Sequence, residues 1–257
     1  MNQAEIMEFI YSAAGLFFVG VFLILMIVFS LQARRSKESP KLRQIPAFQR
    51  VKRAVGLSVE EGTRLHISLG RGSLTDQQGA SALAGLNILA RVVRAASVSD
   101  RPPVATSGEP AIVLLSQDTI RSAYAQANAK ERYSPSSSRL TGVTPFSFAA
   151  GAAPIIQNDQ VSANILVGHF GAEVGLLTDA ITRSDGFAVG GSDHLSGQAV
   201  MYAALPEALI GEEIYAGGAY IEEQPSHVAS LKVQDLFRWA VIIFIVLGAL
   251  SHLAGVQ

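Results

Sequence analysis

Long runs of apolar residues occupy both ends of the chain. The first, 9–32, carries no charged residue, and the second, 236–256, is apolar from Trp239 onward apart from Ser251 and His252. A helix rises about 1.5 Å per residue, so each run approaches or exceeds the roughly 20 residues that cross a hydrocarbon core of about 30 Å. The pattern predicts a membrane-spanning helix at each end.

Basic residues indicate how these spans are oriented. Only Glu5 and Glu8 are charged before the first span, whereas eight of the twenty Lys and Arg residues lie between 34 and 53. Lys and Arg in short flanks stay on the cytoplasmic side. We therefore expect a two-span protein of the cell membrane with both termini outside and its centre in the cytoplasm. A cleaved signal peptide and a hairpin that never crosses are the alternatives; the absence of a basic residue before the first run disfavours the former.

The chain then divides into an extracytoplasmic N-terminus, 1–8, the first span, a basic connector, 33–61, a cytoplasmic domain, 62–235, and the second span. Pro40 and Pro46 interrupt any long helix in the connector. A short amphipathic piece within it offers apolar residues that could dock on the domain: Ile45, Phe48, Val51, Val55 and Leu57.

Between the spans, alternating or continuous apolar segments of strand length are separated by helical patterns. The predicted strands are 64–69, 102–106, 139–143, 161–167 and 187–189, and the predicted helices run from Thr75 as N-cap to about 96, over 117–130, 145–157, and from Pro206 to about 223. Segment 111–115 is either a further strand or the start of a helix, and 172–182 is a helix or a strand pair. Strands that alternate with helices predict an α/β, Rossmann-like domain with a largely parallel sheet.

Composition excludes several classes of chemistry. The chain has no cysteine, which rules out disulfides and thiolate chemistry, and a net charge of −1, which gives no sign of a nucleic-acid surface. Neither span carries a buried charge of the kind that marks a pump or channel. We expect no cofactor.

A Gly-rich turn follows the first predicted strand. Gly70, Arg71, Gly72 and Thr75 lie between a strand and a helix, where a phosphate meets backbone N–H groups. Yet the third glycine and the later acidic residue of a dinucleotide fingerprint are missing, as is Gly-Lys-Ser/Thr. A tight turn, an anion site and a subunit contact remain open interpretations.

A second turn, Gly168-His169-Phe170-Gly171-Ala172-Glu173, follows the strand 161–167. On a shared helix face His169 and Glu173, four residues apart, would form an acid–base pair or two metal ligands; a structural histidine is the alternative. The cluster 192–196 brings serine, aspartate and histidine together without a Gly-x-Ser-x-Gly elbow, which disfavours a hydrolase.

The predicted helix from Pro206 has many small residues. Glycine inside a helix lowers helix stability by about 1 kcal/mol relative to alanine. We therefore expect another part of the molecule or a ligand to approach the backbone of this helix closely. That approach is to the sheet, to a ligand or to a second subunit. For an oligomer contact the candidate residues are Gly211, Glu212, Tyr215, Gly218 and Tyr220.

Several blocks resemble an uncharacterised bacterial membrane family, of Chloroflexota type, that is catalogued only as a domain of unknown function. The blocks are 66–70, 161–164, 168–173, 209–220 and the closing pattern from His227 to Trp239. The resemblance covers nearly the whole chain and implies a two-anchor layout, but it carries no activity.

These observations lead to two functional hypotheses. The first is a membrane-anchored, self-associating scaffold or assembly subunit without catalysis, with the bilayer and copies of itself as partners. The alternative is a membrane-tethered sensor that binds a nucleotide or other anionic small molecule at Gly70, Arg71, Gly72, Thr75, Gly168, His169 and Glu173. An enzyme lacks a recognisable constellation, and we expect no metal site and no nucleic-acid partner.

Overall fold

The computed structural model describes residues 3–35, 42–222 and 224–253. The chain divides into two compact units. One is the globular domain from Arg43 to Glu222, and the other comprises the terminal segments, 1–42 and 223–257. Each unit is described by itself.

The terminal unit consists of two long apolar helices, α1 (Gln3–Arg35) and α9 (Pro225–Leu253). Both are long and apolar enough to cross a membrane, and their most apolar windows are not buried within the described structure. A core helix of a soluble protein would be mostly covered, whereas Phe17 and Phe244 are each 75 % exposed. The rings of Phe18 and Phe237 lie 4.7 Å apart, so the two helices contact each other. Both helices begin before the predicted spans, and residues 254–256 of the second span lie outside the described residues.

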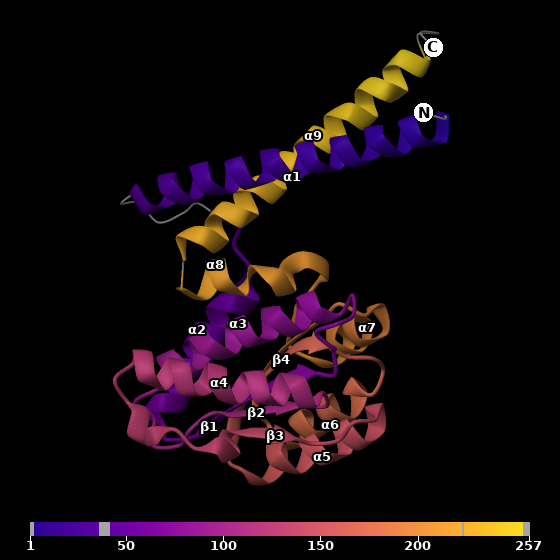
Figure 1. The fold of residues 1–257 in the computed structure, drawn as a ribbon. Helices are drawn as coiled ribbons and strands as arrows, with labels where there is room; N and C mark the ends of the chain where they lie inside the picture. The colour runs from indigo at the N-terminus through magenta and orange to yellow at the C-terminus, as the bar shows by residue number, and fades with distance from the viewer. Residues whose placement is uncertain (1–2, 36–41, 223, 254–257) are drawn as a thin grey trace. The chain divides into compact units, whose positions relative to one another are not determined.

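The globular domain contains a six-stranded, all-parallel sheet of order β3-β2-β1-β4-β5-β6 in the residues described (Figure 1). The strands are β1 (Arg64–Gly70), β2 (Val104–Ser107), β3 (Ser138–Leu140), β4 (Val161–His169), β5 (Phe187–Ser192) and β6 (Glu207–Leu209). The helices are α2 (Pro46–Glu60), α3 (Gly79–Ala95), α4 (Pro110–Gln126), α5 (Pro145–Asn158), α6 (Val174–Ser184), α7 (Leu195–Ala204) and α8 (Gly217–Glu222), with 3₁₀ turns η1 (Lys130–Arg132), η2 (Pro135–Ser137) and η3 (Gly211–Ala216). The α/β, Rossmann-like prediction is confirmed.

Helices cover both faces of the sheet. Helices α3 and α4 lie on one side, and α5 and α6 lie on the other (Figure 1). On the latter side Phe148, Leu166, Phe170 and Leu177 form part of one buried apolar cluster. Coverage on both sides explains why β4 reads as a nearly continuous apolar run.

Helix α2 belongs to the folded unit, although we assigned its residues to the connector 33–61. Its side chains Phe48, Val51 and Val55 are buried as the amphipathic pattern suggested, whereas Leu57 is 47 % exposed. The ring of Phe48 stacks on Tyr220 at 5.2 Å. The domain therefore starts before residue 62.

The predicted helix from Pro206 to about 223 is wrong except at its end, where α8 forms. Residues 207–209 instead form β6, which pairs in parallel with β5 through Gly190 and Gly191. A Cβ on Gly191 would lie 2.6 Å from Ile214 Cγ2 and 2.9 Å from Leu209 Cβ. The absence of a side chain on Gly191 leaves room for Ile214 and Leu209. Any larger residue at position 191 would prevent β6 and η3 from packing against β5.

Two segments had alternative predictions. Segment 111–115, for which a strand or a helix start was possible, lies in α4. Segment 172–182, for which a helix or a strand pair was possible, lies mostly in α6. Helix α7 was not predicted.

A chain of polar side chains is buried across the centre of the sheet. His66 Nδ1 lies 3.0 Å from Asn164 Oδ1, His66 Nε2 lies 2.9 Å from Thr106 Oγ1, and Thr106 Oγ1 lies 3.1 Å from Ser68 Oγ. Burial disfavours the charged imidazolium and lowers the pKa of His66 from 6.5 to about 4. The ring is therefore neutral at physiological pH, with one nitrogen donating and the other accepting.

Candidate functional site at the carboxyl edge of the sheet

The strand order reverses between β1 and β4. In open parallel sheets ligands bind outside the carboxyl ends of the strands at such a switch point. Both Gly-rich turns singled out from the sequence lie here, because Gly70 ends β1 and His169 ends β4.

The glycines of these turns allow the two strand ends to approach each other. Gly70 has φ +67°, and a Cβ there would lie 2.3 Å from the carbonyl oxygen of His169. A Cβ on Gly168 would lie 2.1 Å from the carbonyl oxygen of Leu69, and one on Gly72 would lie 3.1 Å from His169 Cβ. These contacts account for the glycines without any ligand.

Thr75 is not the helix N-cap that we expected. Helix α3 starts at Gly79 after Gln78, and Thr75 lies exposed in the turn 71–78, where its Oγ1 is 3.0 Å from Ser73 Oγ. The turn is longer than predicted because its residues bond to one another before the helix begins.

Arg71 and Glu173 form an ion pair across the switch point, with Arg71 Nε 3.3 Å from Glu173 Oε1. Burial by itself raises the pKa of Glu173, but hydrogen bonds from the backbone N–H groups of Gly171 and Glu173 and the charge of Arg71 outweigh it and lower that pKa. Glu173 caps α6 while His169 lies at the end of β4, so the two do not share a helix face. The acid–base or metal-binding pair on one helix face, which we weighed against a structural histidine, therefore does not form.

His169 instead pairs with Asp193, which follows β5. His169 Nδ1 lies 2.7 Å from Asp193 Oδ1, and Ser81 Oγ in the first turn of α3 donates to Asp193 Oδ2 at 2.6 Å. Burial by itself raises the pKa of Asp193, but these two hydrogen bonds and the charge of His169 lower it. The Asp193 carboxylate thus lies beside the N-terminal turn of α3, where the partial positive charge of a helix favours an anion.

The serines and histidine near Asp193 have separate roles. Ser192 Oγ donates to the carbonyl oxygen of Phe170 at 2.9 Å, whereas His194 Nδ1 lies 2.8 Å from Ser196 Oγ. Because Asp193 bonds to His169 and not to His194, these neighbours do not form a nucleophilic triad. Within the ranges that the structure describes, no three metal-ligating side chains gather to hold an ion.

The residues proposed for oligomer contacts fall into two groups. Gly218 is buried, and Tyr220 donates from its hydroxyl to the carbonyl oxygen of Arg43 at 2.6 Å, so both serve the interior of the domain. Gly211, Glu212 and Tyr215 are exposed in or beside η3, which follows β6.

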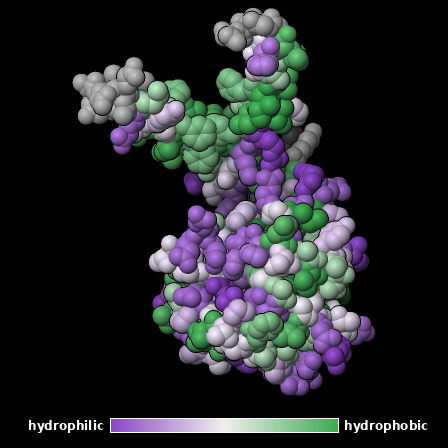
Figure 2. All heavy atoms as spheres, turned by 90° about the vertical axis from the view of Figure 1, so that its right-hand side faces the viewer, coloured by the Kyte–Doolittle hydropathy of each residue, from purple (hydrophilic) through white to green (hydrophobic). Residues whose placement is uncertain are grey.

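Exposed apolar side chains surround the carboxyl edge, a feature that sequence reasoning missed. They lie at strand ends, in the turns that follow, or in the first two turns of the next helix: Leu83, Leu114, Leu140, Val143, Phe146, Leu176, Leu195, Ile210 and Tyr215, each at least 44 % exposed. We name these residues the apolar edge set. Figure 2 shows one face of the molecule, on which hydrophobic residues of the domain lie among hydrophilic ones.

The comparisons with known proteins agree with the resemblance read from the sequence blocks. A family model described as a domain of unknown function, DUF6754, matches residues 5–257. No curated protein and no solved structure matches the chain. Since the match spans nearly its whole length, the chain belongs to the DUF6754 family.

Proposed function

We propose that this protein is a membrane-anchored assembly subunit of the bacterial cell membrane that associates with copies of itself and performs no catalysis. The observation that supports this is the apolar edge set, which includes Phe146 at 69 % and Leu195 at 79 % exposure. Large apolar side chains exposed at one edge of a domain support an interaction site there. Around it, the polar groups at the switch point are engaged with one another, as in the Arg71–Glu173 and His169–Asp193 pairs.

Two anchors in one bilayer favour self-association. Copies inserted in the same direction all have the same side facing the cytoplasm. A symmetric assembly of such copies can therefore use only rotation axes perpendicular to the membrane plane. Such rotations produce closed cyclic assemblies. A stable contact needs roughly 800 Å² per partner, and the apolar edge set would form its centre.

The orientation proposed for these anchors places the globular domain in the cytoplasm. Arg34 and Arg35 end α1, and Arg238 precedes the most apolar part of α9. Positive residues on these flanks support an inner location of the domain, with both termini outside.

Light scattering coupled to size exclusion, on the full chain in detergent, tests the proposal. We expect a defined oligomer for the wild type and a monomer for the double variant Val143→Ser/Phe146→Ser. Val98→Ser is the matched control, because Val98 is 68 % exposed but lies between α3 and β2, at the opposite edge. A monomeric wild type over a wide concentration range, or equal dissociation by the control variant, would contradict the proposal.

The sensor hypothesis is a second candidate, favoured by the strand order, which puts the turn 71–78 and the turn after β4 at the switch point. A nucleotide or other anion bound there would slow hydrogen exchange in residues 71–78 and 169–173. Hydrogen exchange by the full chain, with and without nucleotide, measures this. Unchanged exchange in both segments at saturating ligand would exclude binding at these turns.

A further inference from the structure

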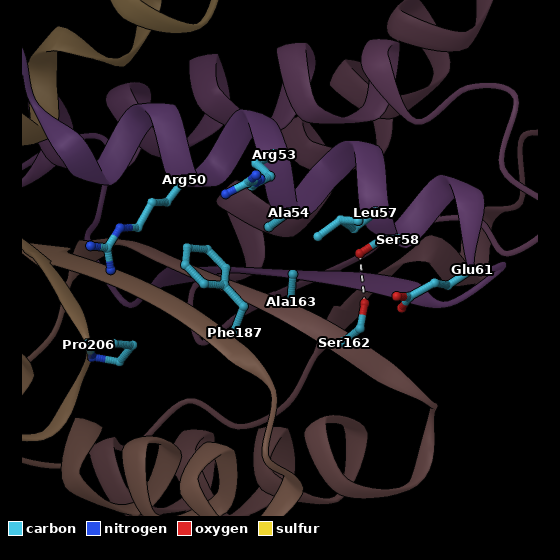
Figure 3. A pocket seen from close by; sticks show the side chains of 10 residues that line it. All are labelled: Arg50, Arg53, Ala54, Leu57, Ser58, Glu61, Ser162, Ala163, Phe187 and Pro206. Atoms are coloured by element: carbon cyan, nitrogen blue, oxygen red, sulfur yellow. Dashed lines mark hydrogen bonds between the residues drawn. The ribbon is translucent and has the colours of Figure 1, made fainter.

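A cavity of about 490 Å³ lies far from the switch point, between α2 and the residues that begin β4, β5 and β6 (Figure 3). Its walls include Arg50, Arg53, Ser58, Glu61, Ser162 and Phe187. Ligand cavities commonly measure about 300–1,000 Å³ and combine apolar walls with a few convergent polar groups. This cavity has both properties, and its two ends differ in chemistry.

One end is basic. Arg50 and Arg53 are three residues apart on α2, so they lie on the same side of the helix. Arg50 forms an ion pair with Glu207, whereas Arg53 has no ion pair or hydrogen bond among the described residues. One positive charge is therefore not neutralised at this end. Guanidinium groups bind phosphate and carboxylate oxygens with paired hydrogen bonds.

The middle of the cavity is apolar and flat. The ring of Phe187 stands against the space below α2, and Leu57 points toward the same space from above (Figure 3). Phe187 is only partly covered by the protein, and Leu57 is 47 % exposed. An aromatic ring with a free face binds another flat ring by stacking.

The other end offers hydrogen-bond acceptors. Ser162 Oγ lies 2.7 Å from Ser58 Oγ and 2.6 Å from Thr63 Oγ1, and Thr63 Oγ1 also donates to the carbonyl oxygen of Ser58. The hydroxyl groups of Ser58, Thr63 and Ser162 have three protons in all, and these three contacts use all of them. The hydroxyl groups therefore donate no hydrogen bond to a ligand, but their oxygens retain lone pairs that can accept one. Glu61 adds a carboxylate at the same end. A ligand must present N–H or O–H donors here.

The spacing of the two ends sets the length of the ligand. Arg53 and Glu61 are eight residues apart at the C-terminal end of α2, which corresponds to about 12 Å along the helix. The occupant therefore has an anion at one end, a flat ring in its middle and donors about 12 Å from the anion. We infer that this cavity binds a nucleoside monophosphate, with its phosphate on Arg50 and Arg53 and the N–H groups of its base toward Ser58 and Glu61.

Calorimetric titration of the full chain in detergent tests this inference. The probes are the four common ribonucleoside monophosphates, the corresponding nucleosides and inorganic phosphate. We expect at least one monophosphate to bind, and its nucleoside and inorganic phosphate to bind at least about tenfold more weakly, since each lacks one half of the recognised groups.

Variants locate the binding in the cavity. Arg53→Gln should weaken nucleotide binding at least about tenfold through loss of a charge-assisted contact, and Phe187→Leu should weaken it severalfold. Lys52→Gln is the matched control, because it removes the same charge from the adjacent residue of α2, which does not line this cavity. Thermal unfolding by circular dichroism verifies that each variant is folded.

Each other outcome overturns the inference. No binding by any monophosphate at millimolar concentration excludes a nucleotide site, and equal affinity for inorganic phosphate reduces it to an anion site. If Lys52→Gln and Arg53→Gln weaken nucleotide binding equally, the effect comes from the overall charge of α2 and not from a contact in the cavity. Slower hydrogen exchange in residues 71–78 but not in 50–61 would place the nucleotide at the Gly-rich turns instead.

Discussion

Acid should destabilise the globular domain through His66, well above the pH at which carboxylates usually protonate. His66 is completely buried, and its pKa in the folded domain is about 4, against 6.5 in the unfolded chain. Between these values the unfolded chain binds a proton that the folded domain does not, so stability falls as the pH falls through 6.5 toward 4. Above about pH 7.5 the imidazole is neutral in both states and this effect vanishes.

The difference between these pKa values sets the magnitude. One pKa unit corresponds to 1.36 kcal/mol, so the difference of about 2.5 units between 6.5 and 4 amounts to about 3 kcal/mol once the pH lies below both values. At pH 5 about 2 kcal/mol of this is already lost. The pKa values of Asp193 and Glu173 are lowered, so the stability they contribute is lost only at still lower pH.

Urea unfolding of the full chain in mild detergent, followed by circular dichroism, measures this loss at pH 7.5 and pH 5. The control is His66→Gln, which keeps hydrogen-bonding capacity toward Asn164 and Thr106 but does not titrate. We expect the wild type to lose about 2 kcal/mol more than the variant between these two pH values. Parallel losses in both proteins would refute the assignment of a buried, neutral His66.

Three further substitutions test the packing of the domain by the same unfolding measurement. Gly85→Ala should destabilise it by about 2 kcal/mol or more, because its Cβ would lie 2.5 Å from the carbonyl oxygen of Val167; an unchanged midpoint would contradict that contact. Gly56→Ala should instead stabilise α2 by up to about 1 kcal/mol, since no atom lies within 4 Å of the added carbon; a loss of stability would count against this. Thr144→Ala should cost about 1 kcal/mol, as it removes the capping box with Ser147 at the start of α5, and no change would show that the cap contributes nothing.

Local patterns predicted most of the sheet because its strands are short apolar runs followed by glycine turns. The run 161–167 is an example, since β4 extends from Val161 to His169. Helix α5 starts at Pro145, as its sequence indicates, because Thr144 supplies the cap. In these segments propensity, capping and burial all favour the same structure.

The segment after Pro206 could not be predicted because distant residues decide its structure. A proline followed by helix-forming residues is typical of a helix start. The backbone of residues 207–209 nevertheless pairs with β5, whose Gly190 and Gly191 leave room for the side chains that follow. The small residues beyond it serve a close approach within the domain: a Cβ on Gly217 would lie 2.5 Å from Ile88 Cγ1.

The sequence placed both Gly-rich turns at the carboxyl edge, but it could not assign the partners of their side chains. Asp193 pairs with His169 and Ser81, which are separated from it by 24 and 112 residues. Spacing instead suggested a local pair between His169 and Glu173. The role of α2 in a cavity was also hidden, because the opposite wall comes from the starts of three strands.

Chemical labelling of single cysteines tests the central claim, that two terminal helices cross the membrane and hold the domain on its inner side. The natural chain has no cysteine, so Glu8→Cys and the exposed Ser136→Cys each supply a unique target. In right-side-out vesicles a membrane-impermeant maleimide should modify Glu8→Cys at once and Ser136→Cys only after the membrane is opened. Modification of Ser136→Cys in sealed vesicles, with Glu8→Cys protected, would contradict the account.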